Sequence, residues 1–418
     1  MAYKHLPYAG RIYDQKEIKS LKAAADEFWL THGRYCDDFQ EKLKLFLGVD
    51  HCLVVNSGSS ANLLAFMALT SPKLGSRRIE RGDEVITTAA CFPTTVTPII
   101  QYGAVPVFVD ITIPQYNLDT SCLDAALSKK TKAVVLAHTL GNPFDLETII
   151  EFCSDNGLWL IEDCADAIGG TYHLDGEIHQ LGSFGDVSTF SFYPAHQITT
   201  GQGGAVATSN DILARIMTSM RDWGRDCTCK PGQDNACGNR FSRQFGDMPV
   251  GYDHKYIYSE FGYNLAMTDM QGSIGTVQMD RLPYFKLCRK ANWNRLHSRL
   301  EKYDDLFYLP EPEVGSDPCW FGFLLTIKDP ERIERRKFQS YLESQGIQTR
   351  LLFSGNMVRQ PCFTQLTSGK DYKVVGILPN TDIVAEQGVW IGVYPGLQPE
   401  DIEYMGDAIS RFVRDRVK

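Results

Sequence analysis

Short apolar runs alternate with helix-like segments between about residues 50 and 210. The apolar runs HCLVV, DEVITTA, VPVFVD, KAVVLAH and LWLIED have the length of buried strands, and segments such as SSANLLAFMALTS, TTVTPIIQYG and LETIIEFCSDNG stand between them. This alternation is typical of βα units whose parallel strands form a sheet covered by helices. The pattern therefore predicts an α/β domain with a mainly parallel sheet.

The pattern changes beyond about residue 276. A long polar helical segment, DRLPYFKLCRKANWNRLHSRLEKY, is followed by WFGFLLTI, by a helix near ERRKFQSYLESQG and by VWIGVYPG. This mixture predicts a smaller α+β domain. We expect a large domain over residues 20–275 and a small C-terminal domain over residues 276–418, with the N-terminal segment 1–19 packing near the small domain.

Composition and charge narrow the class of protein. A chain of 418 residues with 43% hydrophobic residues can bury one large core and a smaller second one. The balance of 42 Lys and Arg against 51 Asp and Glu, with no long basic run, disfavours a nucleic-acid or anionic-membrane surface. The start MAYKHLPYAG lacks the apolar core of a signal peptide, and no apolar run approaches the roughly 18 residues of a spanning helix. We expect a cytoplasmic protein that binds neither nucleic acid nor membrane.

Two motifs fall after predicted strands, where α/β proteins bind ligands. The segment NSGSSAN (56–62) opens a helix, so its backbone N–H groups and hydroxyls suit a phosphate, although a serine-rich helix cap explains it as well. The run LWLIED ends in Glu162 and Asp163. An Asp at a strand's carboxyl end can keep a pyridinium nitrogen protonated, and a helix-capping or solvated acid is the alternative.

The order and spacing of these motifs resemble a known family. SGSSAN, GDEVIT, IEDCADA, SFYPAHQITTGQGGAV and FGYNLAMTDMQ resemble the DegT/DnrJ/EryC1 sugar aminotransferase and dehydratase group of pyridoxal phosphate (PLP) enzymes. LTHGRYCDDFQEKL, AHTLGNPFDL, RDWGRDC, GYDHKY and WIGVYPGL are most similar to the CDP-4-dehydro-6-deoxyglucose 3-dehydrases, which use pyridoxamine phosphate (PMP) in dideoxysugar biosynthesis. The resemblance covers nearly the whole chain. It implies a fold-type I, aspartate aminotransferase-like fold.

The resemblance also implies how the cofactor is held. Gly58, Ser59 and Ser191 would hold the cofactor phosphate. Asn264, in FGYN, would reach the phosphate of the neighbouring subunit's site, which implies a homodimer.

Three further positions match family residues around the cofactor ring. Phe92 would stack on the pyridine ring, Asp163 would pair with the ring nitrogen, and Asp166 would lie near the ring hydroxyl. Residues in shared motifs that would line the substrate pocket, with ordinary packing an equally good explanation, are Arg350, Tyr252, His254 and Tyr394.

His196 stands where the family has the lysine that anchors PLP covalently. A histidine, with a pKa near ~6.5 against ~10.4 for lysine, cannot anchor the cofactor but exchanges protons at neutral pH. A lone histidine is usually structural, but this position favours a catalytic role. We interpret His196 as the general base that takes a proton from the C4′ carbon of noncovalently held PMP. The reaction would be C3 dehydration of a nucleotide-linked 4-keto-6-deoxyhexose.

Three clustered cysteines predict a metal centre. Cys227, Cys229 and Cys237 form a C-x-C-x7-C run in RDCTCKPGQDNAC, whereas the other nine of the twelve cysteines are scattered through core-like sequence. The spacing matches the [2Fe-2S] run of the 3-dehydrases, which implies a cluster loop at about 221–240 and a flavin and iron–sulfur NAD(P)H-dependent reductase as electron donor. A zinc knuckle and free thiols are the alternatives.

The chain departs from the 3-dehydrase pattern at the fourth cluster ligand. The family's cysteine falls at Ala165 here, and Cys164 is one residue earlier, where a side chain ordinarily points elsewhere. Cys91 and Cys36 are further candidates, so the fourth ligand and the cluster type stay open. The segment TYHLDGEIHQLGS is also longer than in the family.

Other functions compete with a reductive 3-dehydrase. One is a non-reductive PLP or PMP sugar dehydratase, deaminase or aminotransferase of the same family, and another is a noncatalytic regulator with the same fold. For the substrate, the resemblance favours a CDP sugar, with a dTDP sugar as the alternative.

Overall fold

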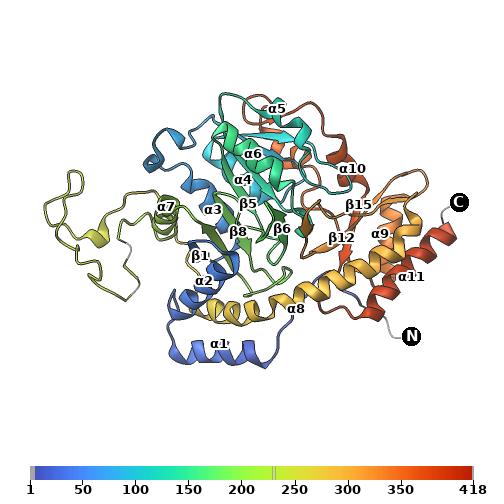
Figure 1. Cartoon of the computed structure of the whole chain (residues 1–418), viewed down its shortest axis with the longest axis horizontal. Coiled ribbons are helices and arrows are strands. Elements are labelled where there is room, and N and C mark those ends of the chain that lie inside the picture. The colour runs from blue at the N-terminus through green and yellow to red at the C-terminus, as the bar shows by residue number, and fades with distance from the viewer. Residues whose placement is uncertain (1–4, 228, 231, 417–418) are drawn as a thin grey trace.

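An eight-stranded sheet forms the centre of the large part of the molecule (Figure 1). The computed structural model describes residues 5–227, 229–230 and 232–416. The strand order is β1-β9-β8-β5-β4-β2-β3-β14, and within this sheet β9 alone runs against its neighbours. The strands are β1 (His51–Val55), β2 (Glu84–Thr88), β3 (Val105–Val109), β4 (Thr131–Ala137), β5 (Trp159–Asp163), β8 (Val187–Ser191), β9 (Gly204–Thr208) and β14 (Lys373–Val374). The prediction of a mainly parallel α/β sheet is confirmed.

Both faces of this sheet are buried, because successive strand residues point to opposite sides. Val54 belongs to the core on one face and Val55 to the core on the other, as do Leu160 and Ile161. The first core is covered by α2 (Arg34–Leu47), α5 (Leu123–Ala126), α6 (Leu146–Asn156) and the first half of α8 (Asp269–Leu300). The second is covered by α3 (Gly58–Ala68), α4 (Pro93–Tyr102) and α7 (Asp211–Arg221).

A four-stranded antiparallel sheet forms the C-terminal part, at the right of Figure 1. Its order is β10 (Phe307–Tyr308), β12 (Gly322–Ile327), β15 (Gly388–Gly392), β13 (Thr349–Arg350). A separate core joins this sheet to α9 (Arg335–Ser344), α11 (Pro399–Arg416) and the second half of α8, and α10 (Pro379–Gln387) packs on β12. The expected boundary at 275/276 falls inside α8, which runs through both parts, and this division stays a prediction.

The N-terminal segment lies against both parts. Leu6 pairs with Ile347 beside the C-terminal sheet, and α1 (Gln15–Glu27) packs along α8. None of the helices in the described part of the chain combines the length and apolarity needed to cross a membrane.

Two segments stand apart from the main layers. The long segment TYHLDGEIHQLGS forms the hairpin β6 (Thr171–Leu174) and β7 (Glu177–Gln180), to which β11 (Ser316–Asp317) adds a third strand. The described residues of the segment 222–262 (222–227, 229–230 and 232–262) contain little regular structure and project from the body of the molecule at the left of Figure 1. Within the predicted cluster loop, positions 228 and 231 lie outside the described residues.

Candidate active site

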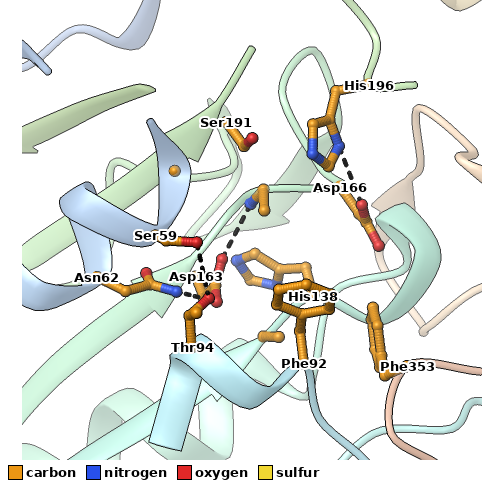
Figure 2. A pocket seen from close by; sticks show the side chains of 13 residues that line it. Ser59, Asn62, Phe92, Thr94, His138, Asp163, Asp166, Ser191, His196 and Phe353 are labelled. Atoms are coloured by element: carbon orange, nitrogen blue, oxygen red, sulfur yellow. Dashed lines mark hydrogen bonds and ion pairs between the residues drawn. The ribbon is translucent and has the colours of Figure 1, made fainter. Parts of the chain in front are cut away.

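A cavity lies at the carboxyl ends of β1, β4, β5 and β8 (Figure 2). Its volume is about 500 Å³ with its open mouth included. Predicted site residues that line it are Gly58, Ser59, Phe92, Asp163, Asp166, Ser191 and His196. The fold therefore brings together residues that are separated by up to 138 positions in the chain.

The N-terminus of α3 forms one wall of the cavity. Ser57 caps the helix by accepting a hydrogen bond from the Ser60 N–H at 3.1 Å. A Cβ on Gly58 would lie 2.4 Å from the Cβ of Ser191, so only glycine lets the end of β8 approach the helix this closely. Free backbone N–H groups and the hydroxyls of Ser59 and Ser191 therefore face the cavity at the positive end of a helix dipole, an arrangement that fits a phosphate.

Asp163, the last residue of β5, forms the floor of the site and is 4% exposed. Its Oδ2 accepts hydrogen bonds from Asn62 Nδ2 at 2.8 Å and Thr95 Oγ1 at 2.7 Å. Its Oδ1 accepts one from the backbone N–H of Ala165 at 3.1 Å. Three donors hold the carboxylate in one orientation, which suits pairing with a protonated ring nitrogen.

His196 and Asp166 form a pair at the opposite side of the cavity from Asp163 (Figure 2). The Nδ1 of His196 lies 3.2 Å from Oδ1 of Asp166, within ion-pair distance but outside hydrogen-bond geometry. Burial raises the pKa of Asp166, and the neighbouring His196 opposes that shift. The backbone carbonyl of His196 accepts a hydrogen bond from the buried Arg289 at 3.2 Å, which fixes the loop that carries the imidazole.

Aromatic rings flank the cavity. Phe92 immediately precedes α4 and is 51% exposed, so a face of its ring is available for stacking. Phe353 comes from the C-terminal part, in a left-handed backbone conformation with φ of 43°. Phe353 was not among the predicted site residues, because nothing in the neighbouring sequence LLFSGN (351–356) indicates that this segment folds back over the sheet.

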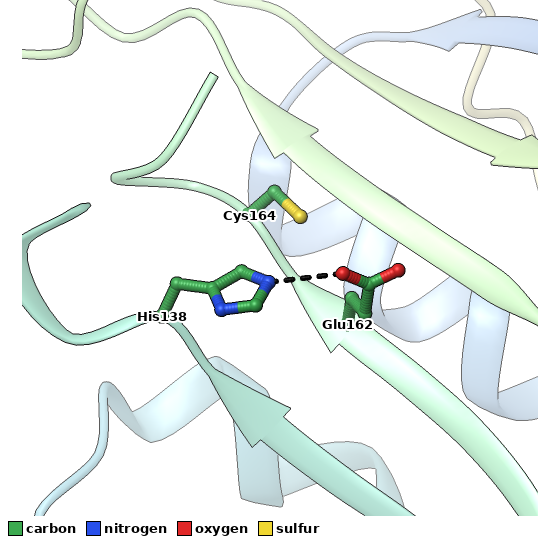
Figure 3. A group of neighbouring side chains, drawn as sticks. All are labelled: His138, Glu162 and Cys164. Atoms are coloured by element: carbon green, nitrogen blue, oxygen red, sulfur yellow. Dashed lines mark hydrogen bonds and ion pairs between the residues drawn. The ribbon is translucent and has the colours of Figure 1, made fainter. Parts of the chain in front are cut away.

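A buried polar group supports the floor of the cavity (Figure 3). His138 Nε2 lies 3.0 Å from Glu162 Oε2, and both side chains are fully buried. Glu162 also accepts hydrogen bonds from backbone N–H groups of residues 182, 184 and 185. Cys164 lies beside the pair, with ligand atoms of all three within 4.8 Å. Because Glu162 is fully engaged by donors, we interpret this group as a brace between β4 and β5.

The cysteines that are candidate cluster ligands lie in two different parts of the described chain. No three of Cys227, Cys229, Cys237 and Cys164 have their sulfurs within 4.8 Å of one another. Cys227 and Cys229 are half-buried and Cys237 is exposed, all in the projecting segment. Burial raises the pKa of Cys164 well above its usual value, which disfavours the thiolate that a metal ligand requires. Burial raises the pKa of Cys36 and Cys91 in the same way.

The predicted substrate residues do not line the cavity in the described chain. Tyr394 is buried in the C-terminal core, and Arg350 stacks over Tyr8 at 3.9 Å. Tyr252 and His254 lie in the projecting segment 222–262.

Asn264 also lies outside the cavity lining. Its backbone pairs with that of Asp222, and Asn264 is itself exposed, as is Phe261 three residues earlier in the chain. It therefore stands at the surface of this chain.

Comparison with known proteins shows the family. The model of the DegT/DnrJ/EryC1/StrS aminotransferase family matches residues 11–410. The chain belongs to this family. It is 50% identical over 407 residues to the lipopolysaccharide biosynthesis protein RfbH of Salmonella typhimurium, covering 97% of this chain and 91% of that protein. It is 45% identical to the dTDP-4-dehydro-2,6-dideoxy-D-glucose 3-dehydratase of Saccharopolyspora spinosa, covering 97% of this chain and 86% of the relative.

A solved structure confirms the expected fold-type I architecture. The E. coli GDP-4-keto-6-deoxy-D-mannose-3-dehydratase with bound hydrated PLP superposes with a TM-score of 0.86 at 26% identity, covering 97% of this chain and 99% of that one. The DegT/DnrJ/EryC1/StrS family membership and this likeness support PLP or PMP as the cofactor and an enzymatic role for the chain.

Proposed function

We propose that this chain is a PMP-dependent sugar 3-dehydratase that removes the C3 hydroxyl of a nucleotide-linked 4-keto-6-deoxyhexose. The observation that carries the proposal is His196 in the cofactor cavity, where no lysine is among the described lining residues. Relatives named as 3-dehydratases and as a lipopolysaccharide biosynthesis protein support a place in deoxysugar biosynthesis for a surface polysaccharide.

The residues present fit PMP. The α3 N-terminus with Ser59 and Ser191 would hold its phosphate, Asp163 its ring nitrogen, and Phe92 one face of its ring. When bound, PMP supplies an amine that condenses with the sugar ketone and a ring that accepts electrons. In a homodimer, Asn264 of one subunit would contribute to the phosphate site of the other.

His196 would move the proton. With Asp166 next to Nδ1, the Nε2 nitrogen is left to accept a proton from the C4′ carbon of the cofactor. The carboxylate stabilises the imidazolium that forms, as in other Asp–His pairs. His196 and Asp166 thus act as a base and its positioning partner.

The proposal includes a reductive second half. Cys227, Cys229 and Cys237 would hold an iron–sulfur cluster that receives electrons from a flavin and iron–sulfur reductase. The donor set, soft thiolates within one loop, suits such a centre. A non-reductive dehydratase or deaminase is the second candidate, favoured by Ala165 at the usual fourth ligand and by the fact that no three described cysteine sulfurs lie within 4.8 Å of one another.

The test is product analysis with purified protein. The chain is incubated anaerobically with PMP, a chemical reductant and the CDP- or dTDP-linked 4-keto-6-deoxyhexose, and products are identified by mass spectrometry. A 3-deoxy product that forms with the CDP sugar, and not with the His196→Asn variant, is the expected result. An amino sugar as the sole product would contradict the proposal and support an aminotransferase.

A further inference from the structure

The side chain of His254 contacts residues at both ends of the segment that carries Cys227, Cys229 and Cys237. Its Nδ1 lies 4.0 Å from the sulfur of Cys237, and its Nε2 lies 2.8 Å from Oδ2 of Asp226. Asp226 directly precedes Cys227. The His254 side chain is 8% exposed, so a buried imidazole has a thiol at one nitrogen and a carboxylate at the other.

Backbone contacts tie both cysteine segments to the same short helix, η4 (His254–Tyr256). The Asp226 N–H donates to the Ile257 carbonyl at 2.9 Å, immediately after this helix. The His254 N–H donates to the Arg240 carbonyl at 2.8 Å, and the Arg240 guanidinium pairs with Asp253 at 2.8 Å. The segments that carry Cys227 and Cys237 are therefore anchored on one turn of the chain.

The imidazole of His254 is also fixed in orientation. Phe245 stacks on it with ring centroids 5.3 Å apart and planes 13° from parallel. Asp226 is held in turn by Ser259, whose hydroxyl donates to Oδ1 at 2.7 Å. A carboxylate at one imidazole nitrogen is the usual way in which proteins aim the other nitrogen at a metal. Here the nitrogen left to ligate is Nδ1, which faces Cys237.

We infer that His254 is the fourth protein ligand of the centre formed by Cys227, Cys229 and Cys237, and that Asp226 orients it. This inference rests on the proposed function, which includes the cluster. It leaves Cys164 in the buried brace beside His138. Imidazole ligation raises the reduction potential of an iron–sulfur centre above that of an all-thiolate one.

The test is electron paramagnetic resonance spectroscopy of the reduced protein. The protein is purified anaerobically from cells grown with unlabelled or 15N-labelled histidine. We expect a strongly coupled imidazole nitrogen whose coupling changes with the isotope. His254→Cys should keep iron and sulfide, lose the nitrogen coupling and shift the potential downward. Cys164→Ser and the surface control His179→Ala should leave metal content and spectrum unchanged. PMP binding, which uses a separate cavity, reports that each variant is folded.

The outcomes separate the inference from the function on which it rests. Iron and sulfide in the wild type without nitrogen coupling, or loss of the cluster in Cys164→Ser, would overturn the assignment of His254 and leave the cluster in place. A wild-type protein with zinc, or with neither iron nor sulfide, would overturn the iron–sulfur part of the proposed function itself.

Discussion

Among single residues, the proposed chemistry depends on which side chain occupies position 196. A histidine can take and return a proton but cannot hold PLP covalently, whereas a lysine does both. Asp166 lies beside His196, and Asp163 lies across the cavity. We propose that these two carboxyl groups determine the local charge around the transferred proton. His196, Asp166 and Asp163 are therefore the residues whose substitution should change the proposed reaction most.

His196→Lys is expected to abolish formation of a 3-deoxy product. The lysine would anchor PLP and favour complete transamination, because it can also return the proton to the cofactor carbon. Product analysis and the visible absorption of bound PLP check the result. A variant that binds PLP covalently yet retains dehydratase turnover would contradict the role of His196.

Asp166→Asn is expected to change how stability depends on pH. Burial raises the pKa of Asp166 above its ordinary 3.8, so the folded protein binds this proton more tightly than the unfolded chain. The resulting stabilisation is full below about pH 3.8 and is lost as the pH rises through the raised pKa, whereas asparagine does not titrate. The melting temperature of the variant, relative to wild type, should therefore rise as the pH is increased above about 3.8. A difference that does not vary with pH would refute the assigned shift.

At the scale of elements, the site exists because helix N-termini and strand ends meet at one edge of the sheet. The pattern of apolar runs predicts the position of this edge, because the strands and helices of the βα units can be recognised from local hydrophobic periodicity. The reversal of β9 and the pairing of β14 with β3 depend on contacts far apart in the chain, which no local pattern encodes.

The candidate site was predictable where a motif carries it and not elsewhere. Asp163 and His196 lie in motifs, but Asn62 and Thr95 reach Asp163 through the folding of α3 and α4 onto β5. The position of Asn62 one helical turn after Gly58 is the signal that could have identified it. Motifs do not reveal which way a loop folds, and Tyr394, a candidate pocket residue with ordinary packing as the equal alternative, lies in a core.

Gly58→Ala is expected to weaken PMP binding by about tenfold or more. The added Cβ would lie 2.4 Å from the Cβ of Ser191, so α3 and β8 must separate at the phosphate cradle. Overpacking of this kind costs about 1–3 kcal/mol, and about 1.4 kcal/mol is a tenfold change in affinity. Titration of apoprotein with PMP measures the effect.

Ser60→Ala is the matched control, since Ser60 is on the same helical turn but does not line the cavity. It should bind PMP as the wild type does. Equal affinity of the Gly58 variant and wild type would show that the helix N-terminus is not the phosphate site.

At the scale of the whole molecule, the account requires a second subunit. Asn264 is exposed and does not line the cavity of its own chain, and Phe261, three residues earlier, is 97% exposed. Val250, Tyr256 and Tyr258 of the same segment are also exposed, and a concentration of exposed apolar side chains is typical of an interface. The site would be completed only where two chains meet.

Phe261→Asp is expected to convert the protein to a monomer and to weaken PMP binding. Light scattering should give twice the 47.0 kDa chain mass for wild type and a single chain mass for the variant. Val314→Asp, at a site that is 83% exposed and distant in sequence from Asn264, should remain a dimer. A monomeric wild type with full PMP affinity would remove Asn264 from the site.

Exchange of the C4′ hydrogen of PMP would report whether His196 transfers the proton. PMP carrying deuterium at C4′ is bound to the protein, the CDP-linked 4-keto-6-deoxyhexose is added, and loss of deuterium is followed by mass spectrometry. We expect washout that depends on the sugar and slows by about 10²–10⁴-fold in His196→Asn, the usual contribution of a general base. Washout at the wild-type rate in that variant would show that another group moves the proton.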